Sequence, residues 1–303
     1  MCAMKILITG SNGLLGSNLI RYYTAKNENK VFATSLSPSY TPLSNFTEGD
    51  LLDAVFVDRL ISDIRPDIII NTVSLVNIEK CEEDPKLASL LTVKTAENIA
   101  RKARQIGTRL IYISTDHLFE GTKSFYSEED EPEPVNVYGT LKYKAESRTR
   151  DLYSDAVIVR TNFYGWSHSL HPPTFGEWVF DSLKHHRPIK LFTDYYFTPI
   201  EVTYLAEALD NVAKSNFVGI INIAGSQRCS KYEFGIALAD VFQFDPGLIS
   251  EGKIEATSFK VRRQKDLSLS TKKFTRIFNQ KLPDLSEGLQ RFYENRGLLI
   301  QEK

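Results

Sequence analysis

Short, wholly apolar runs alternate with longer helical patterns along the first half of the chain, and this alternation limits the fold more than any other feature. A strand that is apolar at every position is buried on both faces, as in a parallel sheet covered by helices on both sides. Right-handed crossovers then wind the chain twice around the sheet. The predicted strands are Ile6–Thr9, Val31–Ser35, Ile68–Asn71, Arg109–Ser114 and Ala156–Arg160, and the predicted helices are Gly13–Ala25, Val55–Ile64, Pro85–Ile106 and Tyr138–Leu152.

The pattern loosens after Arg160, where residues 164–174 are rich in Gly, His, Ser and Pro and indicate a loop. A buried strand is predicted at Gly219–Ala224, and helices at Phe175–His186, Thr203–Lys214, Lys231–Phe242 and Ser286–Arg296. We therefore predict an α/β fold with a doubly wound parallel sheet and a smaller C-terminal lobe. The sheet domain would comprise residues 1–163 with 193–224, and the lobe, which would bind the substrate, residues 164–192 with 225–303.

Composition excludes several classes of protein. The net charge of −1 provides no field that would attract nucleic acid or an anionic membrane surface. No apolar run reaches the roughly 18 residues of a membrane span, and the N-terminus leads into Lys5–Ile8 without a signal-peptide layout. The three cysteines are few and odd in number, which indicates a reducing compartment, here the cytoplasm, and no disulfide framework.

Metal binding is not expected either, because no Cys and His residues stand at ligand spacing. His185 and His186 are adjacent, so on a helix their side chains would point about 100° apart and form a poor chelate.

Three glycines follow the first predicted strand and precede the first predicted helix, in Gly10-Ser11-Asn12-Gly13-Leu14-Leu15-Gly16. Gly10 allows the tight turn, Gly13 lets a pyrophosphate approach the backbone at the helix N-terminus, and Gly16 lets the helix pack closely on the strand. The strand–turn–helix context indicates a Rossmann-like site for a dinucleotide.

The end of the second strand, residues 33–37, carries no acid to bind the ribose 2′-hydroxyl of NAD(H), and no Arg or Lys to hold a 2′-phosphate. Nothing there repels that phosphate, so NADP(H) is favoured over NAD(H). Asp50 follows a further expected strand. It either accepts a hydrogen bond from the adenine or caps the Val55–Ile64 helix.

Tyr138 and Lys142 are one helical turn apart and lie on one helix face. A cation close to a phenol favours the phenolate and lowers its pKa, and a tyrosine tuned in this way can exchange a proton with a carbonyl oxygen. Ser114-Thr115-Asp116 follows the Arg109–Ser114 strand, at the edge where ligands bind in open α/β sheets. There it would either polarise the same oxygen or form a turn or an N-cap. Tyr22 and Lys26 repeat the four-residue spacing, but well along the first helix, where we expect surface residues.

These motifs together resemble the extended short-chain dehydrogenases/reductases and, among them, the dTDP-4-dehydrorhamnose reductase family. The resemblance runs from Lys5 to about Ser270. It rests on the glycine loop, on the Tyr138/Lys142 pair and on four segments: Ser114 to Gly121, Pro134 to Gly139, Arg160 to Gly165 and Arg263 to Leu269.

The resemblance implies NAD(P)H-dependent reduction of the C4 ketone of a nucleotide-activated 4-keto-6-deoxy sugar, with a homodimer as the expected assembly. It makes Thr115 the polarising hydroxyl and Tyr138 the proton donor, and it makes Lys142 the residue that binds the nicotinamide ribose and lowers the pKa of Tyr138. The expected cofactor-binding residues are Gly10, Asn12, Gly13, Leu14, Leu15, Gly16, Ser35, Asp50, Leu51, Val73, Ser74, Tyr138 and Lys142. The expected substrate-binding residues are Ser114, Asp116, His117, Asn162, Trp178 and Arg263, with Arg263 proposed for the phosphates.

The chain departs from the family pattern at Thr92, where an Asn is usual, at Thr72-Val73-Ser74, where alanines are usual, and at Gln264, where a Pro is usual. Two other functions stay open. Sugar dehydratases share the Ser-Thr-Asp start but usually continue with Glu where this chain has His117, and an epimerase belongs to the same alternative. A regulatory subunit of methionine adenosyltransferase has similar motifs and would bind NADP and a partner, with residues 166–175 and Trp178 as the expected contacts.

Overall fold

The computed structural model describes residues 3–40, 43–167, 173–257 and 259–297, and its centre is a parallel β-sheet. The sheet has seven strands in the order β11-β6-β5-β4-β1-β2-β3. They are β1 (Lys5–Thr9), β2 (Lys30–Ser35), β3 (Phe46–Glu48), β4 (Ile68–Asn71), β5 (Arg109–Ile113), β6 (Val157–Arg160) and β11 (Gly219–Asn222). The order runs outward from β1 in both directions, so the predicted doubly wound α/β fold is confirmed.

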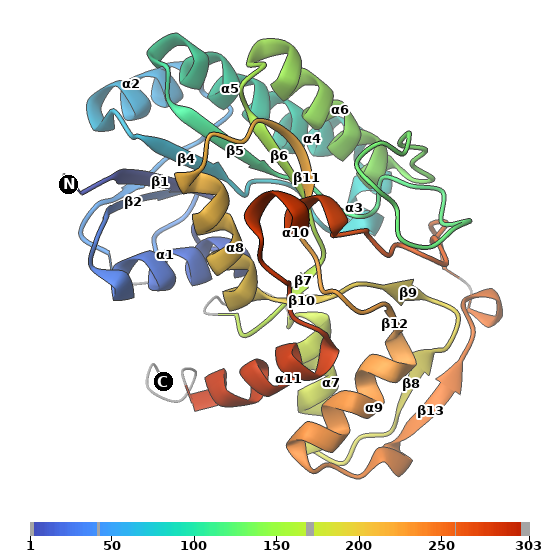
Figure 1. The fold of residues 1–303 in the computed structure, drawn as a ribbon. Helices are drawn as coiled ribbons and strands as arrows, with labels where there is room; N and C mark the ends of the chain where they lie inside the picture. Colours follow the sequence, from blue (N-terminus) through green and yellow to red (C-terminus); the bar gives the residue numbers. More distant parts are fainter. Residues whose placement is uncertain (1–2, 41–42, 168–172, 258, 298–303) are drawn as a thin grey trace.

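Helices cover both faces of this sheet (Figure 1). The helices α1 (Leu14–Lys26) and α8 (Val202–Lys214) pack on one face, and α2 (Ala54–Ile64), α5 (Thr95–Ile106) and α6 (Val137–Leu152) pack on the other. Strand β1 shows why its sequence must be apolar throughout. Ile6 and Ile8 belong to the α1/α8 core, whereas Leu7 belongs to the α2/α5 core.

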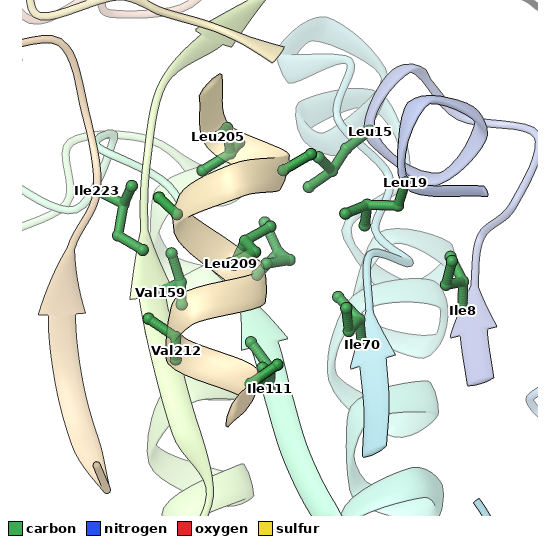
Figure 2. Close-up of a cluster of buried hydrophobic side chains, with 14 of the residues drawn as sticks. Ile8, Leu15, Leu19, Ile70, Ile111, Val159, Leu205, Leu209, Val212 and Ile223 are labelled. Carbon is green, nitrogen blue, oxygen red and sulfur yellow. The ribbon is translucent and has the colours of Figure 1, made fainter. Parts of the chain in front are cut away.

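The α1/α8 core holds the first helix against the sheet (Figure 2). Leu19 of α1 and Leu209 of α8 are fully buried, with Ile8 and Ile70 of the sheet in the same cluster. Burying each such side chain contributes about 1.5–3 kcal/mol. This packing fixes the start of α1, and therefore the glycine loop, relative to the strand ends.

A second hydrophobic cluster lies in the C-terminal part of the chain, formed by elements in the lower part of Figure 1. It joins α7 (Phe175–Lys184), α9 (Lys231–Phe242) and α11 (Leu285–Glu294) with β8 (Ile189–Phe192) and β13 (Ile249–Gly252), which pair in parallel. Trp166 packs there on Phe292 at 4.0 Å between ring centroids. The residue ranges proposed for the two domains stay a prediction.

The helix predicted at Pro85–Ile106 is continuous, but it contains a π-helical turn in its middle. Segment α4 (Pro85–Ser89) is followed by the π-helical η1 (Leu90–Lys94) and then by α5. The N–H of Thr95 donates to the carbonyl of Leu90, five residues back, which produces the wider turn. Hydrophobic periodicity cannot signal such an insertion.

The sequence did not predict several short elements, because each is too short to show periodicity. These are α3 (Ile78–Glu83), β7 (Phe163–Tyr164), β9 (Tyr196–Phe197), β10 (Ile200–Glu201), β12 (Cys229–Ser230), η2 (Pro246–Leu248), η3 (Ile254–Ala256) and α10 (Lys272–Phe278). None of the helices formed by the described residues is both long and apolar enough to span a membrane.

Candidate functional site

Most of the predicted site residues follow four adjacent strands of the sheet. Thr9 pairs with Asn71 and Asn71 with Tyr112, and Ile113 pairs with Val159 on the next strand. The carboxyl ends of β1, β4, β5 and β6 therefore lie in a row. The loops that follow them form one edge of the sheet, where ligands bind in folds of this kind.

The glycine loop has the geometry that its spacing predicts. Gly10 has φ +70°, a conformation that favours glycine. A Cβ on Gly16 would lie 2.3 Å from the carbonyl oxygen of Gly10, so only glycine allows α1 to approach the turn this closely. Gly13 is the N-cap of α1 and has no side chain to cap the first turn. The backbone N–H groups from Leu14 and Leu15 onward are thus available to an anionic ligand.

Asn12 joins this loop to the segment after β2. Its side-chain NH₂ group donates to Ser35 Oγ at 2.9 Å and to the Pro38 carbonyl at 2.8 Å, and its oxygen accepts from the Tyr40 N–H at 3.2 Å. Ser35, at the end of β2, in turn donates to the Ser37 carbonyl at 2.6 Å. Asn12 therefore orders the segment that would face the adenosine ribose.

Asp50 does not cap α2. Asp53 is the N-cap of that helix and accepts from the Val55 N–H, whereas Asp50 Oδ1 accepts from the Leu52 N–H at 2.9 Å. The Leu51 carbonyl accepts from Asn98 of α5 at 3.0 Å. The other alternative, an adenine contact of Asp50, stays a prediction.

The segment after β4 lies directly against the glycine loop. Thr72 Oγ1 donates to the Thr9 carbonyl at 2.7 Å, and a Cβ on Gly10 would meet the Val73 side chain at 3.1 Å. Ser74 Oγ lies 3.2 Å from Thr92 Oγ1, in the π-helical turn. Thr92, which stands where the family usually has an Asn, therefore stabilises this loop through its contact with Ser74.

Tyr138 and Lys142 lie at the start of α6 and are both buried. Asn136 caps the helix by accepting from the Gly139 N–H at 2.9 Å. A Cβ on Gly139 would lie 2.3 Å from the His117 carbonyl oxygen, so this glycine lets α6 pack directly on the segment after β5. The ring of Tyr138 consequently lies 5.5 Å from that of His117, and the Thr115 hydroxyl is close enough to act on the pKa of the phenol.

The prediction that Lys142 lowers the pKa of Tyr138 is wrong for this structure. Burial raises the pKa of the phenol above its ordinary value, the Thr115 hydroxyl opposes that rise, and the charge of Asp116 adds to it. Lys142 Nζ instead donates to the Ile113 carbonyl at 2.7 Å and to Tyr112 Oη at 2.9 Å. Burial lowers the pKa of Lys142 itself to about 7.

Asp116, the next residue after Thr115, is almost fully buried, and its Oδ2 accepts from Asn162 Nδ2 at 2.6 Å. Burial raises the pKa of this carboxyl group to about 6, against the hydrogen bond from Asn162. His117 has no partner for its buried Nδ1, and burial followed by the charges of Arg263 and Lys231 lowers its pKa to about 3. The hydroxyl of Ser114 is buried without a partner as well.

The structure places the last two predicted substrate residues differently. Arg263 forms an ion pair with Glu79 of α3 and remains close enough to affect His117 electrostatically. Trp178 on α7 is 39% exposed and stacks on Phe175 at 6.2 Å. Residues 168–172 of the loop proposed for substrate or partner contacts lie outside the described residues.

Two residues of this site escaped the sequence analysis. Lys231 is the first residue of α9, directly after the N-cap Ser230, whose capping box is completed by Glu233, and Tyr195 precedes β9. The charge of Asp116 acts on the pKa of both side chains, so both lie near the predicted pocket. A lysine in the first turn of a helix opposes the helix dipole, which is the signal that could have singled out Lys231.

Tyr22 and Lys26 lie in the second half of α1, away from the glycine loop, and contact α8. Both contact Asp210 Oδ2 of α8, at 3.3 Å from Tyr22 Oη and 2.8 Å from Lys26 Nζ. Lys26 is exposed as expected, but Tyr22 is only half-exposed because it packs against the α1/α8 core. No three His, Cys, Asp or Glu side chains in the described part of the chain are grouped so that they could hold a metal ion.

Known proteins share this sequence and fold over most of their length. The chain is 29% identical over 251 residues to the probable low-salt glycan biosynthesis reductase Agl14 of Haloferax volcanii, covering 81% of this chain and 83% of that protein. It is 30% identical over 245 residues to methionine adenosyltransferase 2 subunit beta of Xenopus laevis, with coverage of 78% and 72%. The solved structure of dTDP-4-dehydrorhamnose reductase from Bacillus anthracis in complex with NADP superposes with a TM-score of 0.87 at 24% identity, covering 97% and 99% of the two chains.

The doubly wound sheet, the glycine loop and the Tyr138/Lys142 pair define an extended short-chain dehydrogenase/reductase. The family model described as RmlD substrate binding domain matches residues 4–297. The chain therefore belongs to that family, in agreement with the resemblance to dTDP-4-dehydrorhamnose reductases seen in its motifs.

Proposed function

We propose that this protein reduces the C4 ketone of a nucleotide-activated 4-keto-6-deoxy sugar with NADPH. The observation that carries the proposal is the juxtaposition of Tyr138 with Thr115 at the carboxyl edge of the sheet, beside the glycine loop. The reductases among the similar proteins support the reaction type.

The glycine loop fits a dinucleotide, because Gly16 permits the close turn and α1 begins without a side-chain cap. The backbone from Gly13 to Gly16 would hold the pyrophosphate, and Lys142 would hold the nicotinamide ribose. The cofactor supplies the hydride. We propose NADP(H) over NAD(H), supported by the absence of an acid in residues 33–37 and by the NADP in the Bacillus anthracis structure.

Tyr138 acts as the acid in this proposal. Because burial raises the pKa of its phenol, the hydroxyl carries its proton at neutral pH and can donate it to the ketone oxygen. The Thr115 hydroxyl lies near this phenol and would position both oxygens. Asp116 and Asn162 would orient the sugar through their free hydrogen-bonding capacity.

The test is NADPH consumption with a dTDP-4-keto-6-deoxyhexose. Tyr138→Phe is expected to abolish turnover and largely spare NADPH binding. Tyr22→Phe is the matched control, since Tyr22 precedes a lysine at the same spacing but contacts Asp210 of α8. Equal loss of turnover and cofactor binding in Tyr138→Phe would contradict its role, and no turnover across several nucleotide 4-keto sugars would refute the reductase proposal.

A second candidate is a non-catalytic, NADP-binding regulatory subunit. The 30% identity to a methionine adenosyltransferase beta subunit favours it. This function predicts that the protein co-purifies with a second chain from its own organism and changes that chain's activity without consuming NADPH. The epimerase or dehydratase alternative predicts turnover without added reduced cofactor.

A further inference from the structure

Lys231 is enclosed by aromatic rings and lies near Asp116 and His117. Its Nζ lies 3.5 Å from the ring centroid of Phe197, 4.0 Å from that of Phe175 and 5.3 Å from that of Tyr195. The side chain is half-buried. The rings attract a cation but offer it no hydrogen-bond acceptor.

The ammonium of Lys231 also has unused donors. Within the described residues its Nζ makes no hydrogen bond and no ion pair, although it carries three N–H groups. The other cations of the site are bound, Lys142 to Tyr112 and the Ile113 carbonyl, and Arg263 to Glu79. Among these three cations of the described residues, Lys231 is thus the one whose donors are all unused.

The charge pattern indicates which ligand this is. Lys231 interacts electrostatically with Asp116 and with His117, whose Nδ1 is buried without a partner. A partly desolvated ammonium at a helix N-terminus is unfavourable, and an anionic oxygen compensates for it far better than a neutral hydroxyl does. Of the groups in a sugar nucleotide, only the diphosphate carries such oxygens.

We propose that Lys231 binds a phosphoryl oxygen of the substrate's nucleoside diphosphate, with Phe175, Tyr195 and Phe197 fixing its position. This inference rests on the proposed function for the identity of the substrate. It assigns the phosphate contact to Lys231 in place of Arg263, whose charge Glu79 already neutralises.

The experiment is calorimetric titration of the full-length protein with dTDP and with UDP, with thymidine and uridine as probes that lack phosphate. Lys231→Met fills the aromatic cage without a charge and is expected to weaken binding of the diphosphate by about tenfold or more, the usual loss for a hydrogen bond to a charged group. Lys231→Gln, which keeps N–H donors without the charge, is expected to lose most of the same affinity. Lys231→Arg should retain it within a few-fold.

The matched control is Lys184→Met, because Lys184 on α7 also lies over an aromatic ring, that of Phe180 at 5.6 Å, but is exposed. Its diphosphate affinity should equal that of the wild type, and thermal unfolding of each variant verifies its fold. Unchanged diphosphate affinity in folded Lys231→Met and Lys231→Gln, or wild-type protein that binds neither dTDP nor UDP, would overturn the proposal. Because these titrations involve no hydride transfer, a failure of the proposed reduction leaves their result unaffected.

Discussion

The buried carboxyl group of Asp116 should make the protein less stable at neutral pH than it would be with an amide in that position. Asp116 is 1% exposed, and burial raises its pKa to about 6. The same group in the unfolded chain has a pKa of about 3.9. The folded state therefore binds the proton more tightly, and the protein loses stability as pH rises from the unfolded value to the folded one.

The magnitude follows from the difference of about two pKa units, each worth ~1.4 kcal/mol. Ionisation of Asp116 should cost about 3 kcal/mol at pH 7, about half of that at pH 5, and almost nothing below pH ~3.5. Asp116→Asn removes this cost. Its amide oxygen can still accept from Asn162, and its NH₂ group faces Thr115 Oγ1, which can accept as well as donate.

Urea unfolding of the wild type and of Asp116→Asn at pH 5 and pH 7 measures this difference. The variant should be more stable at both pH values, and its advantage should be roughly twice as large at pH 7. Asp210→Asn is the control, because here the replacement should lower the free energy of unfolding instead of raising it. Although burial alone would raise the pKa of Asp210, hydrogen bonds from Lys26 and Lys214 lower it overall, so this variant should be destabilised. An Asp116→Asn variant that is no more stable than the wild type at pH 7 would refute the reasoning.

Two further regions of the structure give sharp expectations. Gly16→Ala should lower the thermal unfolding midpoint, because its Cβ would lie 2.3 Å from the Gly10 carbonyl oxygen, whereas Gly13→Ala meets that oxygen only at 3.3 Å. Gly13→Ala should therefore stay folded and instead weaken NADPH binding measured by fluorescence; equal unfolding midpoints for the two variants would count against this view of the loop. Arg160→Met should cost about 3–5 kcal/mol in urea unfolding, since it leaves Glu146, 1% exposed and bonded to Arg160 at 2.9 Å, without its partner. A loss of unfolding free energy below 1 kcal/mol would mean that this buried ion pair contributes little to stability.

Elements that carry their own local signal were predictable from the sequence. The apolar strand Ile68–Asn71 matches β4, and the glycine spacing gave the turn between β1 and α1. The sequence also predicted that Tyr138 and Thr115 share one site, because ligands bind at the carboxyl edge of such a sheet.

Other features depend on contacts that a linear pattern does not contain. The direction of the pKa shift of Tyr138 was wrong because the spacing to Lys142 says nothing about burial, which dominates. Lys231 was missed because its neighbours in space, Asp116 and the ring of Phe197, come from segments far apart in the chain. The π-helical turn around Thr92 likewise depends on a single backbone hydrogen bond.

The most direct test of the proposed chemistry follows the transferred hydrogen. The protein is incubated with a dTDP-4-keto-6-deoxyhexose and NADPH that carries deuterium at the transferable C4 position, and the sugar product is analysed by mass spectrometry and NMR. We expect one NADPH to be oxidised for each sugar reduced, deuterium at C4 of the sugar, and no product with Tyr138→Phe. Unconsumed NADPH, or a product without deuterium at C4, would contradict the proposed chemistry.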